Sequence, residues 1–307
     1  MRKAVIDVGS NSVLLLVEEP EGSGWRTVLE DAEVTALGAD TKQTGVLGEE
    51  GMAATLSCLK RFFGSAREVG AERCEACGTM SLRIAANAAE FRRRAAEQAT
   101  PVEIISGEVE AQLGFESVAY DATFAGYDRI SIIDPGGQST ELTTADRRAP
   151  GWSVTFRKSF PIGTLALRGG TLCAETPGPG ELLRAVGEID AAVGIDYLRG
   201  AAGRAIVLGA TGTNLISVRD RILSWEPKLI HGRTLSFEEV SRFVSSLGSL
   251  TDAQRAAVPG MEPGRERTIH LGALVLERLM NAIGVPDVAV SVRGWRHALL
   301  ERGLPEV

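Results

Sequence analysis

The chain of 307 residues carries 44% hydrophobic residues and a formal net charge of −7. This length leaves room for two domains, and the hydrophobic fraction is enough to bury a core in each. The acidic balance argues against a nucleic-acid partner, so a polyanionic substrate would have to be held by a local basic site. No apolar run approaches the ~18 residues of a membrane span, and no signal-peptide pattern follows Arg2-Lys3. We therefore expect a cytoplasmic protein with no membrane partner.

The four cysteines do not form the pattern of a disulfide framework in a chain of this length. Cys74 and Cys77 make a C-x-x-C, but they fall where a strand is expected. A spacing of three on a strand sends the two side chains to opposite faces, whereas ligating pairs normally occur at turns or helix starts. We expect no metal or redox role for this pair, and the three histidines are scattered.

The first predicted element is an antiparallel hairpin at residues 5–17, which reads as an apolar strand, a glycine turn and a second apolar strand. Asp7 ends the first strand, and the turn carries the candidate phosphate-binding residues Ser10, Asn11 and Ser12. A further strand between residues 24 and 37 would extend the hairpin into a meander.

An amphipathic helix is predicted at residues 49–69, followed by a short strand at 74–77 and a second helix at 81–98. Arg83 would lie in the first turn of that second helix, where a helix N-terminus favours anions. A guanidinium there can hold a phosphate with two donors. The alternative is a salt bridge or an ordinary surface arginine.

A strand at residues 102–105 leads into a helix that opens at Ser106-Gly107 and carries Glu108, Glu110 and Glu116. Acids in a first helical turn commonly do no more than interact with the helix dipole. A change of composition at residues 120–128 suggests the domain boundary. We place the N-terminal lobe at 1–124 and the C-terminal lobe at 125–307, with the last helix free to pack back on the first lobe.

Residues 132–142 combine an apolar run, an acid, a glycine turn, two hydroxyls and a second acid. Asp134 and Glu141 would bracket the tip of a hairpin. Bare backbone N–H groups at Gly136 and Gly137 can cradle phosphate oxygens while Asp134 holds a divalent cation. The hydroxyls of Ser139 and Thr140 would donate to the same anion. The alternative is an ordinary hairpin with solvated acids.

This stretch nearly repeats the N-terminal hairpin, and a third glycine turn follows an apolar run at residues 207–213. The repeat suggests two halves of related build that face each other across a cleft. The third turn supplies the further candidate phosphate-binding residues Gly209, Thr211, Gly212 and Thr213.

The other elements of the second half follow from the same patterns. Capping boxes at Ser236 and Thr251 predict that a helix begins at each. The remaining predictions are a strand at 152–160, a helix at 180–198 with Leu182, Leu183, Val186, Ile189 and Val193 on one face, a strand at 205–208, a buried helix at 268–282, a strand at 288–292 and a helix at 295–302.

Six sequence blocks resemble the exopolyphosphatase and guanosine pentaphosphate phosphohydrolase (Ppx/GppA) family in its short, two-domain form. They are D-V-G-S-N-S at 7–12, G-T-M-S-L-R at 78–83, I-S-G-E-V-E-A at 105–111, D-P-G-G-Q-S-T-E-L at 134–142, F-P-I-G-T at 160–164 and G-A-T-G-T at 209–213. The resemblance implies an α/β fold of two ribonuclease-H-like lobes around a central cleft, as in the actin, sugar-kinase and chaperone ATPase superfamily.

The resemblance also assigns roles to single residues. Arg83 matches the family's phosphate-contacting arginine, and Glu110 matches its catalytic glutamate. Magnesium is implied near Asp134, with Asp7 and Glu141 in its outer shell. Departures from the family pattern occur at Val109, Gln112, Pro135, Gln138, Arg267 and Val292.

The implied function is metal-dependent removal of a terminal phosphate from polyphosphate or, as second choice, from guanosine penta- or tetraphosphate (ppGpp). Glu110 would act as general base for an in-line water, and Arg83 would hold the phosphoryl group. The alternatives are a binding or regulatory protein that has lost catalysis, a phosphatase for another phosphorylated metabolite, and a kinase of the same superfamily. The sequence leaves the oligomeric state, monomer or homodimer, open.

Overall fold

The computed structural model describes residues 1–22, 24–149, 151–194 and 203–303. The chain divides into two compact units, residues 1–113 with 295–307 and residues 114–294. The chain therefore first passes from one unit to the other within helix α5 (Gly107–Ala119), and not at the change of composition at 120–128. Within the part of the chain that the structure describes, no helix is both long and apolar enough to cross a bilayer.

The first unit is built on a five-stranded sheet with the order β3-β2-β1-β4-β5. The predicted hairpin and meander are confirmed, because β1, β2 and β3 pair antiparallel in sequence order. The next two strands pair parallel on the other side of β1. The strands are β1 (Lys3–Val8), β2 (Ser12–Glu21), β3 (Gly24–Val34), β4 (Arg73–Gly78) and β5 (Val102–Ile104).

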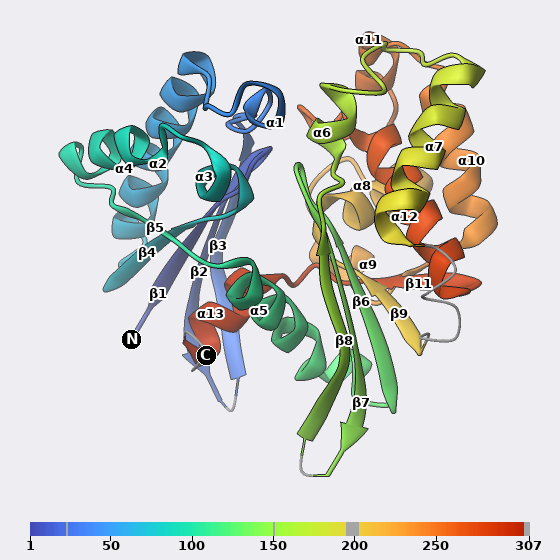
Figure 1. Ribbon diagram of the computed structural model, residues 1–307. Helices are drawn as coiled ribbons and strands as arrows, with labels where there is room; N and C mark the ends of the chain where they lie inside the picture. Colours follow the sequence, from blue (N-terminus) through green and yellow to red (C-terminus); the bar gives the residue numbers. More distant parts are fainter. Residues whose placement is uncertain (23, 150, 195–202, 304–307) are drawn as a thin grey trace. The chain divides into compact units, whose positions relative to one another are not determined.

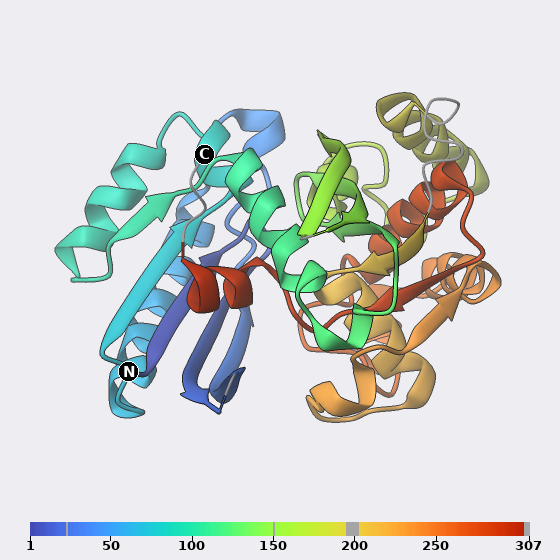
Figure 2. The same cartoon turned by 90° about the horizontal axis from the view of Figure 1, so that it is seen from below.

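Helices cover both faces of this sheet (Figure 1 and Figure 2). On one face, α2 (Glu49–Glu68) and α4 (Ala88–Glu97) bury Phe62 and Phe91 against the strands. On the other face, α13 (Trp295–Arg302) buries Trp295 with Val5 and Leu16. The C-terminal helix thus belongs to the core of the first unit, because its apolar residues pack on β1 and β2.

The single helix predicted at 81–98 is wrong, because the chain forms two helices there, α3 (Met80–Ile84) and α4. Ala85 between them is extended, with φ −75° and ψ 128°. The side chain of Asn87, just after this residue, bonds to the segment after the short helix α1 (Thr41–Thr44): Leu47 N donates to Asn87 Oδ1 at 2.8 Å, and Asn87 Nδ2 donates to Leu47 O at 3.0 Å. These tertiary bonds replace the local bonds of a continuous helix.

Cys74 and Cys77 point to opposite faces of β4, as predicted. Cys74 packs against the cluster beneath α2, whereas Cys77 belongs to the cluster beneath α13. Burial raises the pKa of each thiol to about 12, so neither is a thiolate near neutral pH.

The second unit contains a six-stranded sheet with the order β10-β11-β9-β6-β7-β8. Its β6, β7 and β8 form an antiparallel meander, and β9 and β11 continue parallel to β6. These five strands repeat the arrangement of β1 to β5, which extends the internal repeat beyond the two hairpins, and β10 is an additional edge strand that pairs antiparallel with β11. The strands are β6 (Arg129–Pro135), β7 (Thr140–Arg148), β8 (Gly151–Phe160), β9 (Arg204–Val207), β10 (Thr234–Ser236) and β11 (Asp287–Val290).

The helices of the second unit gather mainly on one face of the sheet around the buried helix α12 (Figure 1). The other face packs against the C-terminal half of α5 and the 3-10 turn η1 (Ala122–Phe124). Both predicted capping boxes, at Ser236 and Thr251, are confirmed. The helices are α6 (Thr164–Arg168), α7 (Pro179–Val193), α8 (Gly209–Asp220), α9 (Pro227–Ile230), α10 (Phe237–Gly248), α11 (Asp252–Ala256) and α12 (Ile269–Ile283).

One predicted core residue of α7 is wrong. Leu183 is 73% exposed, whereas Ile189 and Val193 are buried. The buried stripe runs through Leu182, Ala185 and Ile189, and Leu183 lies about 100° away from it on the helix. The predicted end of this helix, at 195–198, lies outside the described residues.

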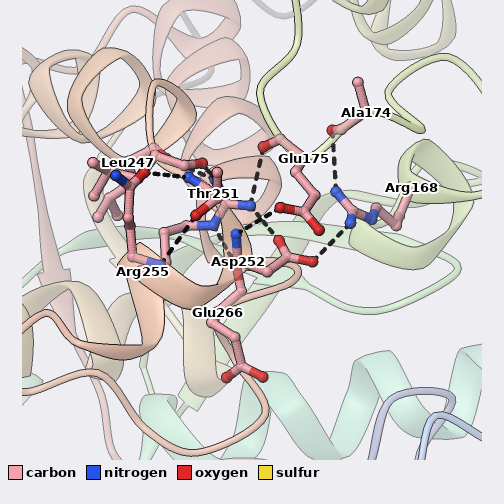
Figure 3. Close-up of polar contacts among 10 residues, drawn as sticks. Arg168, Ala174, Glu175, Leu247, Thr251, Asp252, Arg255 and Glu266 are labelled. Carbon is pink, nitrogen blue, oxygen red and sulfur yellow. Dashed lines mark hydrogen bonds and ion pairs between the residues drawn. The ribbon is translucent and has the colours of Figure 1, made fainter.

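A fully buried arginine holds the end of α10 and α11 together (Figure 3). Arg255 donates from Nη1 to Leu247 O at 2.8 Å and from Nη2 to Glu175 O at 3.0 Å, and it also pairs with Asp252. Asp252 accepts a second bond from Arg168 Nη2 at 2.9 Å. The charge of Arg255 is thus compensated by a carboxylate and several carbonyls, as a buried guanidinium requires.

Candidate functional site

The turn between β6 and β7 is closed by a bond from Gly136 N to Ser139 O at 2.9 Å. Asp134 and Glu141 lie directly opposite each other in the register of the two strands. Directly opposite residues have their side chains on the same face of a sheet, so the two carboxylates are neighbours. Glu141 Oε1 also accepts a bond from Ser159 Oγ at 2.7 Å.

The start of α6 fixes the direction of the peptide groups in this turn. Thr164 N donates to Gly136 O at 3.0 Å, and Leu165 N donates to Gly137 O at 2.7 Å. In a trans peptide the N–H points opposite to the C=O. The N–H groups of Gly137 and Gln138 therefore point away from α6, as a phosphate cradle requires.

Thr140 does not have the role predicted for its hydroxyl. Its side chain is buried, and Oγ1 donates to Ile162 O at 2.6 Å. The hydroxyl proton that was expected to bind a substrate anion is instead donated to Ile162 O, and this bond fixes the F-P-I-G-T segment beside the turn.

The turn between β1 and β2 has the same construction. Gly9 N donates to Ser12 O at 3.0 Å, and a Cβ added to Gly9 would lie 2.9 Å from that oxygen. The equivalent Cβ on Gly136 would lie 2.8 Å from Ser139 O, so both turns need glycine at this position.

Backbone N–H groups of the segment after β3 donate to the carbonyl oxygens of this first turn. Gly38 N donates to Ser10 O at 2.8 Å, and Ala36 N donates to Asn11 O at 2.9 Å. The N–H groups of Asn11 and Ser12 therefore point away from that segment, because they belong to the same peptide groups. The predicted repeat thus extends to the direction of the backbone donors.

The third turn is the beginning of a helix. Gly209 has a φ of +73° and opens α8 directly after β9. A Cβ added to Gly209 would lie 3.2 Å from Asp134 Oδ1, so the Asp134 carboxylate lies against the N-terminus of this helix. The first-turn N–H groups of a helix of this length can bind a phosphate oxygen.

The side chains at the start of α8 have partly structural environments. Thr211 is buried against Gly272 of α12, and a Cβ on Gly212 would meet Val207 at 2.6 Å. Thr213 Oγ1 donates to Ala210 O at 3.4 Å. The backbone of this turn therefore offers donors, while its side chains mainly pack.

The predicted magnesium ligands divide between the two units. Asp134 and Glu141 lie together in the second unit, and Asp7 is the penultimate residue of β1 in the first, opposite Leu14 and Cys77. Two adjacent carboxylates suit Mg²⁺, which usually keeps several waters and binds substrate phosphates. Among the described residues no group of three or more His, Cys, Asp or Glu is placed to hold a metal ion.

Arg83 and Glu110 form an ion pair in the first unit. Arg83 Nη1 donates to Glu110 Oε2 at 2.8 Å and to Ile105 O at 3.0 Å. Both side chains are mostly buried, at 17% and 13% exposed. Burial raises the pKa of Glu110 above its ordinary value, and the Arg83 charge opposes that shift.

Ser106 places Glu110 in the first turn of α5, because its Oγ accepts a bond from Val109 N at 3.1 Å. Glu108 in the same turn is exposed. Val109, a departure from the family pattern, packs half-buried against the cluster that contains Trp295. The structure thus separates the two glutamates, since only Glu110 has a buried, paired carboxylate.

The predicted position of Arg83, in the first turn of a long helix whose N-terminus favours anions, is wrong. Arg83 lies in the last turn of α3, which has five residues, and not at the N-terminus of a long helix. The helix dipole therefore gives Arg83 no special preference for anions. The pairing with Glu110 was missed, although both residues stand in blocks that the sequence singled out, because no pattern links segments so far apart.

Two other departures from the family pattern have structural partners or environments. Gln138 is 2% exposed in the β6–β7 turn. Val292 N donates to His231 Nδ1 at 3.3 Å, which fixes the segment after β11.

A model of the Ppx/GppA phosphatase family matches residues 16–306. The structure of the Aquifex aeolicus member of that family is similar, with a TM-score of 0.78 and 26% identity over 98% of this chain and 96% of that chain. An exopolyphosphatase from Cytophaga hutchinsonii has a TM-score of 0.86 and 21% identity over 98% and 96% of the two chains. An exopolyphosphatase-like protein has a TM-score of 0.88 and 22% identity over 97% and 96%. These likenesses confirm the predicted class of two actin-like α/β lobes.

Proposed function

Because the chain belongs to the Ppx/GppA phosphatase family, we propose that it removes the terminal phosphoryl group of polyphosphate. Guanosine penta- or tetraphosphate is the second candidate substrate. The observation that carries the proposal is the buried pair of Glu110 and Arg83, with Oε2 and Nη1 2.8 Å apart. Phosphoryl transfer needs little beyond positioning and charge stabilisation, and this pair can contribute to both.

Glu110 is the proposed general base. Burial raises the pKa of its carboxyl, which makes the carboxylate a stronger acceptor for a proton from water. The charge of Arg83 opposes this rise in pKa, and the bond from Arg83 restricts the orientation of the carboxylate. Arg83 uses Nη1 for its bonds to Glu110 and Ile105, and Nη2 lies 3.6 Å from the weak acceptor Met80 Sδ, so the guanidinium has further N–H donors to offer a phosphoryl oxygen.

The proposed phosphate donors are backbone N–H groups. Those of Asn11 and Ser12 in the first turn, and of Gly137 and Gln138 in the second, are oriented by carbonyls that are bound on the opposite side. The first turn of α8 adds further donors beside Asp134. Fixed backbone donors suit a chain of equivalent phosphates, because they recognise oxygens and not a base or a sugar.

Asp134 and Glu141 are the proposed holders of magnesium. Bound there, Mg²⁺ would neutralise charge on the phosphoryl oxygens. Asp134 is the first choice as a direct ligand, because its carboxylate lies beside the backbone donors at the start of α8. Glu141 is the second choice, because its Oε1 already accepts a bond from Ser159.

A second candidate is a family member that binds phosphate compounds or acts on another phosphorylated metabolite. Gln138 favours this second candidate. Its side chain is buried in the β6–β7 turn, whose backbone N–H groups are the proposed phosphate donors, and a glutamine at this position departs from the family pattern. Such a change alters the cradle without removing it.

One assay tests these proposals. Phosphate release is measured from polyphosphate, guanosine pentaphosphate and nucleotides, each with and without magnesium. We expect release from polyphosphate that depends on magnesium. Binding of these compounds without any release, with the wild-type protein, would overturn the hydrolase proposal and support the binding protein.

A further inference from the structure

The register of the second sheet puts a cationic side chain on the face that carries the candidate magnesium ligands. Asp134 lies opposite Glu141, and Glu141 lies opposite Ser159 of β8, the last strand in the order of the sheet. Directly opposite side chains share a face, as the bond from Ser159 Oγ to Glu141 Oε1 shows for the outer pair. Arg157 comes two residues before Ser159, so its side chain lies on the same face.

The two faces of this sheet have different coverings. Ile132, two residues before Asp134, packs in the cluster beneath the C-terminal half of α5. Ile133 faces the other side and packs in the core that contains Leu167 of α6. Asp134 and Arg157 therefore lie on the α5 face of the sheet, whereas α6 covers the opposite face.

The proposed phosphate donors of the β6–β7 turn are directed toward the face of Asp134. The carbonyls of Gly136 and Gly137 are bound by the N-terminus of α6, so the N–H groups of Gly137 and Gln138 point away from that helix. A phosphate on these donors thus lies on the side of the sheet that carries Asp134 and Arg157.

Arg157 lies one step along the strands beyond the two carboxylates. Two residues of a strand span about 7 Å, an interval that a long arginine side chain can cover. The partner of Arg157 in the register is Thr143, which is buried, whereas Arg157 is exposed on the edge strand of the sheet (Figure 1). The guanidinium is therefore accessible to a ligand that extends from the turn past Ser159.

The chemistry of this position suits a phosphate chain. Every unit of polyphosphate is anionic, and a guanidinium binds phosphate oxygens with two directed donors. The whole chain carries a net charge of −7, so a contact beyond the terminal phosphate depends on a local cation. A neutral part of a substrate would gain no such attraction from Arg157.

We propose that Arg157 binds a phosphate of the substrate chain beyond the terminal one, and that it thereby favours long polyphosphate over short. Arg157 determines specificity and takes no part in the chemical step, because the reacting phosphate is held at the turn and Asp134. The proposal rests on the proposed function, since it takes this turn as the place of the terminal phosphate.

The test compares Arg157→Gln with Lys158→Gln, which removes the same charge from the next residue of the same strand. Lys158 is also exposed, but it lies opposite Leu142, and its Nζ lies 4.9 Å from the centroid of the Phe160 ring. Its side chain therefore belongs to the other face of the sheet. A difference between the two variants reports the position of the charge and not the net charge. Arg157→Lys, which keeps the charge but loses the directed pair of donors, should lie between wild type and Arg157→Gln.

The first measurement is the Kd of long polyphosphate and of pyrophosphate, with every variant made in a Glu110→Gln background so that turnover does not consume the ligand. Arg157→Gln should raise the Kd of long polyphosphate by about five- to tenfold, the usual size of one charge-assisted contact, and the effect should shrink as salt is added. The Kd of pyrophosphate should stay nearly unchanged, and Lys158→Gln should match its parent for both ligands. Equal affinities for long polyphosphate in the two glutamine variants would overturn the role of Arg157.

The second measurement is turnover in the wild-type background. Arg157→Gln should raise KM for long polyphosphate by about the factor seen in Kd and leave kcat within about twofold, because a contact away from the reacting phosphate contributes equally to ground and transition states. Normal hydrolysis with equal KM values in Arg157→Gln and Lys158→Gln would reject the contact and retain the hydrolase. Weakened binding in Arg157→Gln alone, with a wild type that releases no phosphate, would retain the contact and reject hydrolysis. A wild type that neither binds nor hydrolyses polyphosphate would reject both.

Discussion

Arg83 Nη1 lies 2.8 Å from Glu110 Oε2, and the pair joins two segments that are separate in the sequence. The arginine comes from the short helix α3, while the glutamate comes from the first turn of α5. Because both side chains are mostly buried, each restricts the direction of the other, and the Arg83 charge opposes the rise that burial causes in the pKa of Glu110. Changing one residue of the pair at a time therefore separates the proposed role of Glu110 as the base from the effect of Arg83 on the pKa of that base.

Replacing Glu110 by glutamine should lower turnover by about 10² to 10⁴-fold, the usual contribution of a general base. Glutamine keeps the size of the side chain and can still accept the bond from Arg83, so substrate should bind as before. The measurement is kcat and the Kd of polyphosphate. Glu108→Gln is the matched control, because Glu108 is exposed in the same helical turn, and it should be nearly silent. A loss of turnover in Glu108→Gln alone would contradict the assignment.

Replacing Arg83 by alanine should move the acidic limb of the pH–rate profile to higher pH. The Arg83 charge holds the pKa of Glu110 down against the effect of burial, so its removal raises that pKa and leaves less carboxylate at a given pH. The unpaired carboxylate should also lower the free energy of unfolding by about 1–3 kcal/mol.

Arg83→Lys is the control for charge in this series. It should restore most of the pH profile, but it cannot reproduce two directed guanidinium bonds, to Glu110 and Ile105. A pH profile that is unchanged in Arg83→Ala would show that the pair does not tune the base.

Replacing Asp134 by asparagine should weaken activation by magnesium while the fold stays intact. The carboxylate lies at the N-terminus of α8 opposite Glu141, so its loss removes one of two adjacent anionic ligands. A magnesium titration of phosphate release checks this, and circular dichroism checks the fold. Asp128→Asn, at an exposed position just before β6, should leave the titration unchanged. An unaltered titration in Asp134→Asn would remove Asp134 from the site.

The parts of the fold that could be predicted are those with local causes. The β6–β7 hairpin follows from an apolar run and two glycines, and the starts of α10 and α11 follow from Ser236 and Thr251, whose partners lie within the next turn. The opposite orientation of Cys74 and Cys77 needs only the period of a strand.

The errors have causes elsewhere in the chain. The break between α3 and α4 depends on Asn87 bonding to Leu47, far away in sequence, whereas the local pattern at 81–98 is helical throughout. Leu183 is apolar, but the phase of α7 is set by Leu182, Ala185 and Ile189, which pack in the core and leave Leu183 exposed. At the site, the identity of Glu110 came from the family blocks. Its pairing with Arg83 required the tertiary structure.

His270 should make the protein sensitive to acid. It is buried in α12, and burial, with the charges of Arg255 and Arg168, lowers its pKa from 6.5 to about 3. A folded-state pKa below the unfolded value means that the unfolded chain binds the proton first. The contribution to stability is therefore present above pH ~6.5 and is lost as the pH falls toward 3, by about 2 kcal/mol at pH 5.

The measurement is urea unfolding of the wild type and of His270→Leu between pH 5 and 8. Neither ring nitrogen of His270 has a hydrogen-bond partner among the described residues, so leucine removes the titrating group without leaving another polar group unpaired. Its stability should fall less between pH 7 and pH 5 than that of the wild type, by about 2 kcal/mol. Equal slopes for wild type and His270→Leu would show that another group causes the loss of stability in acid.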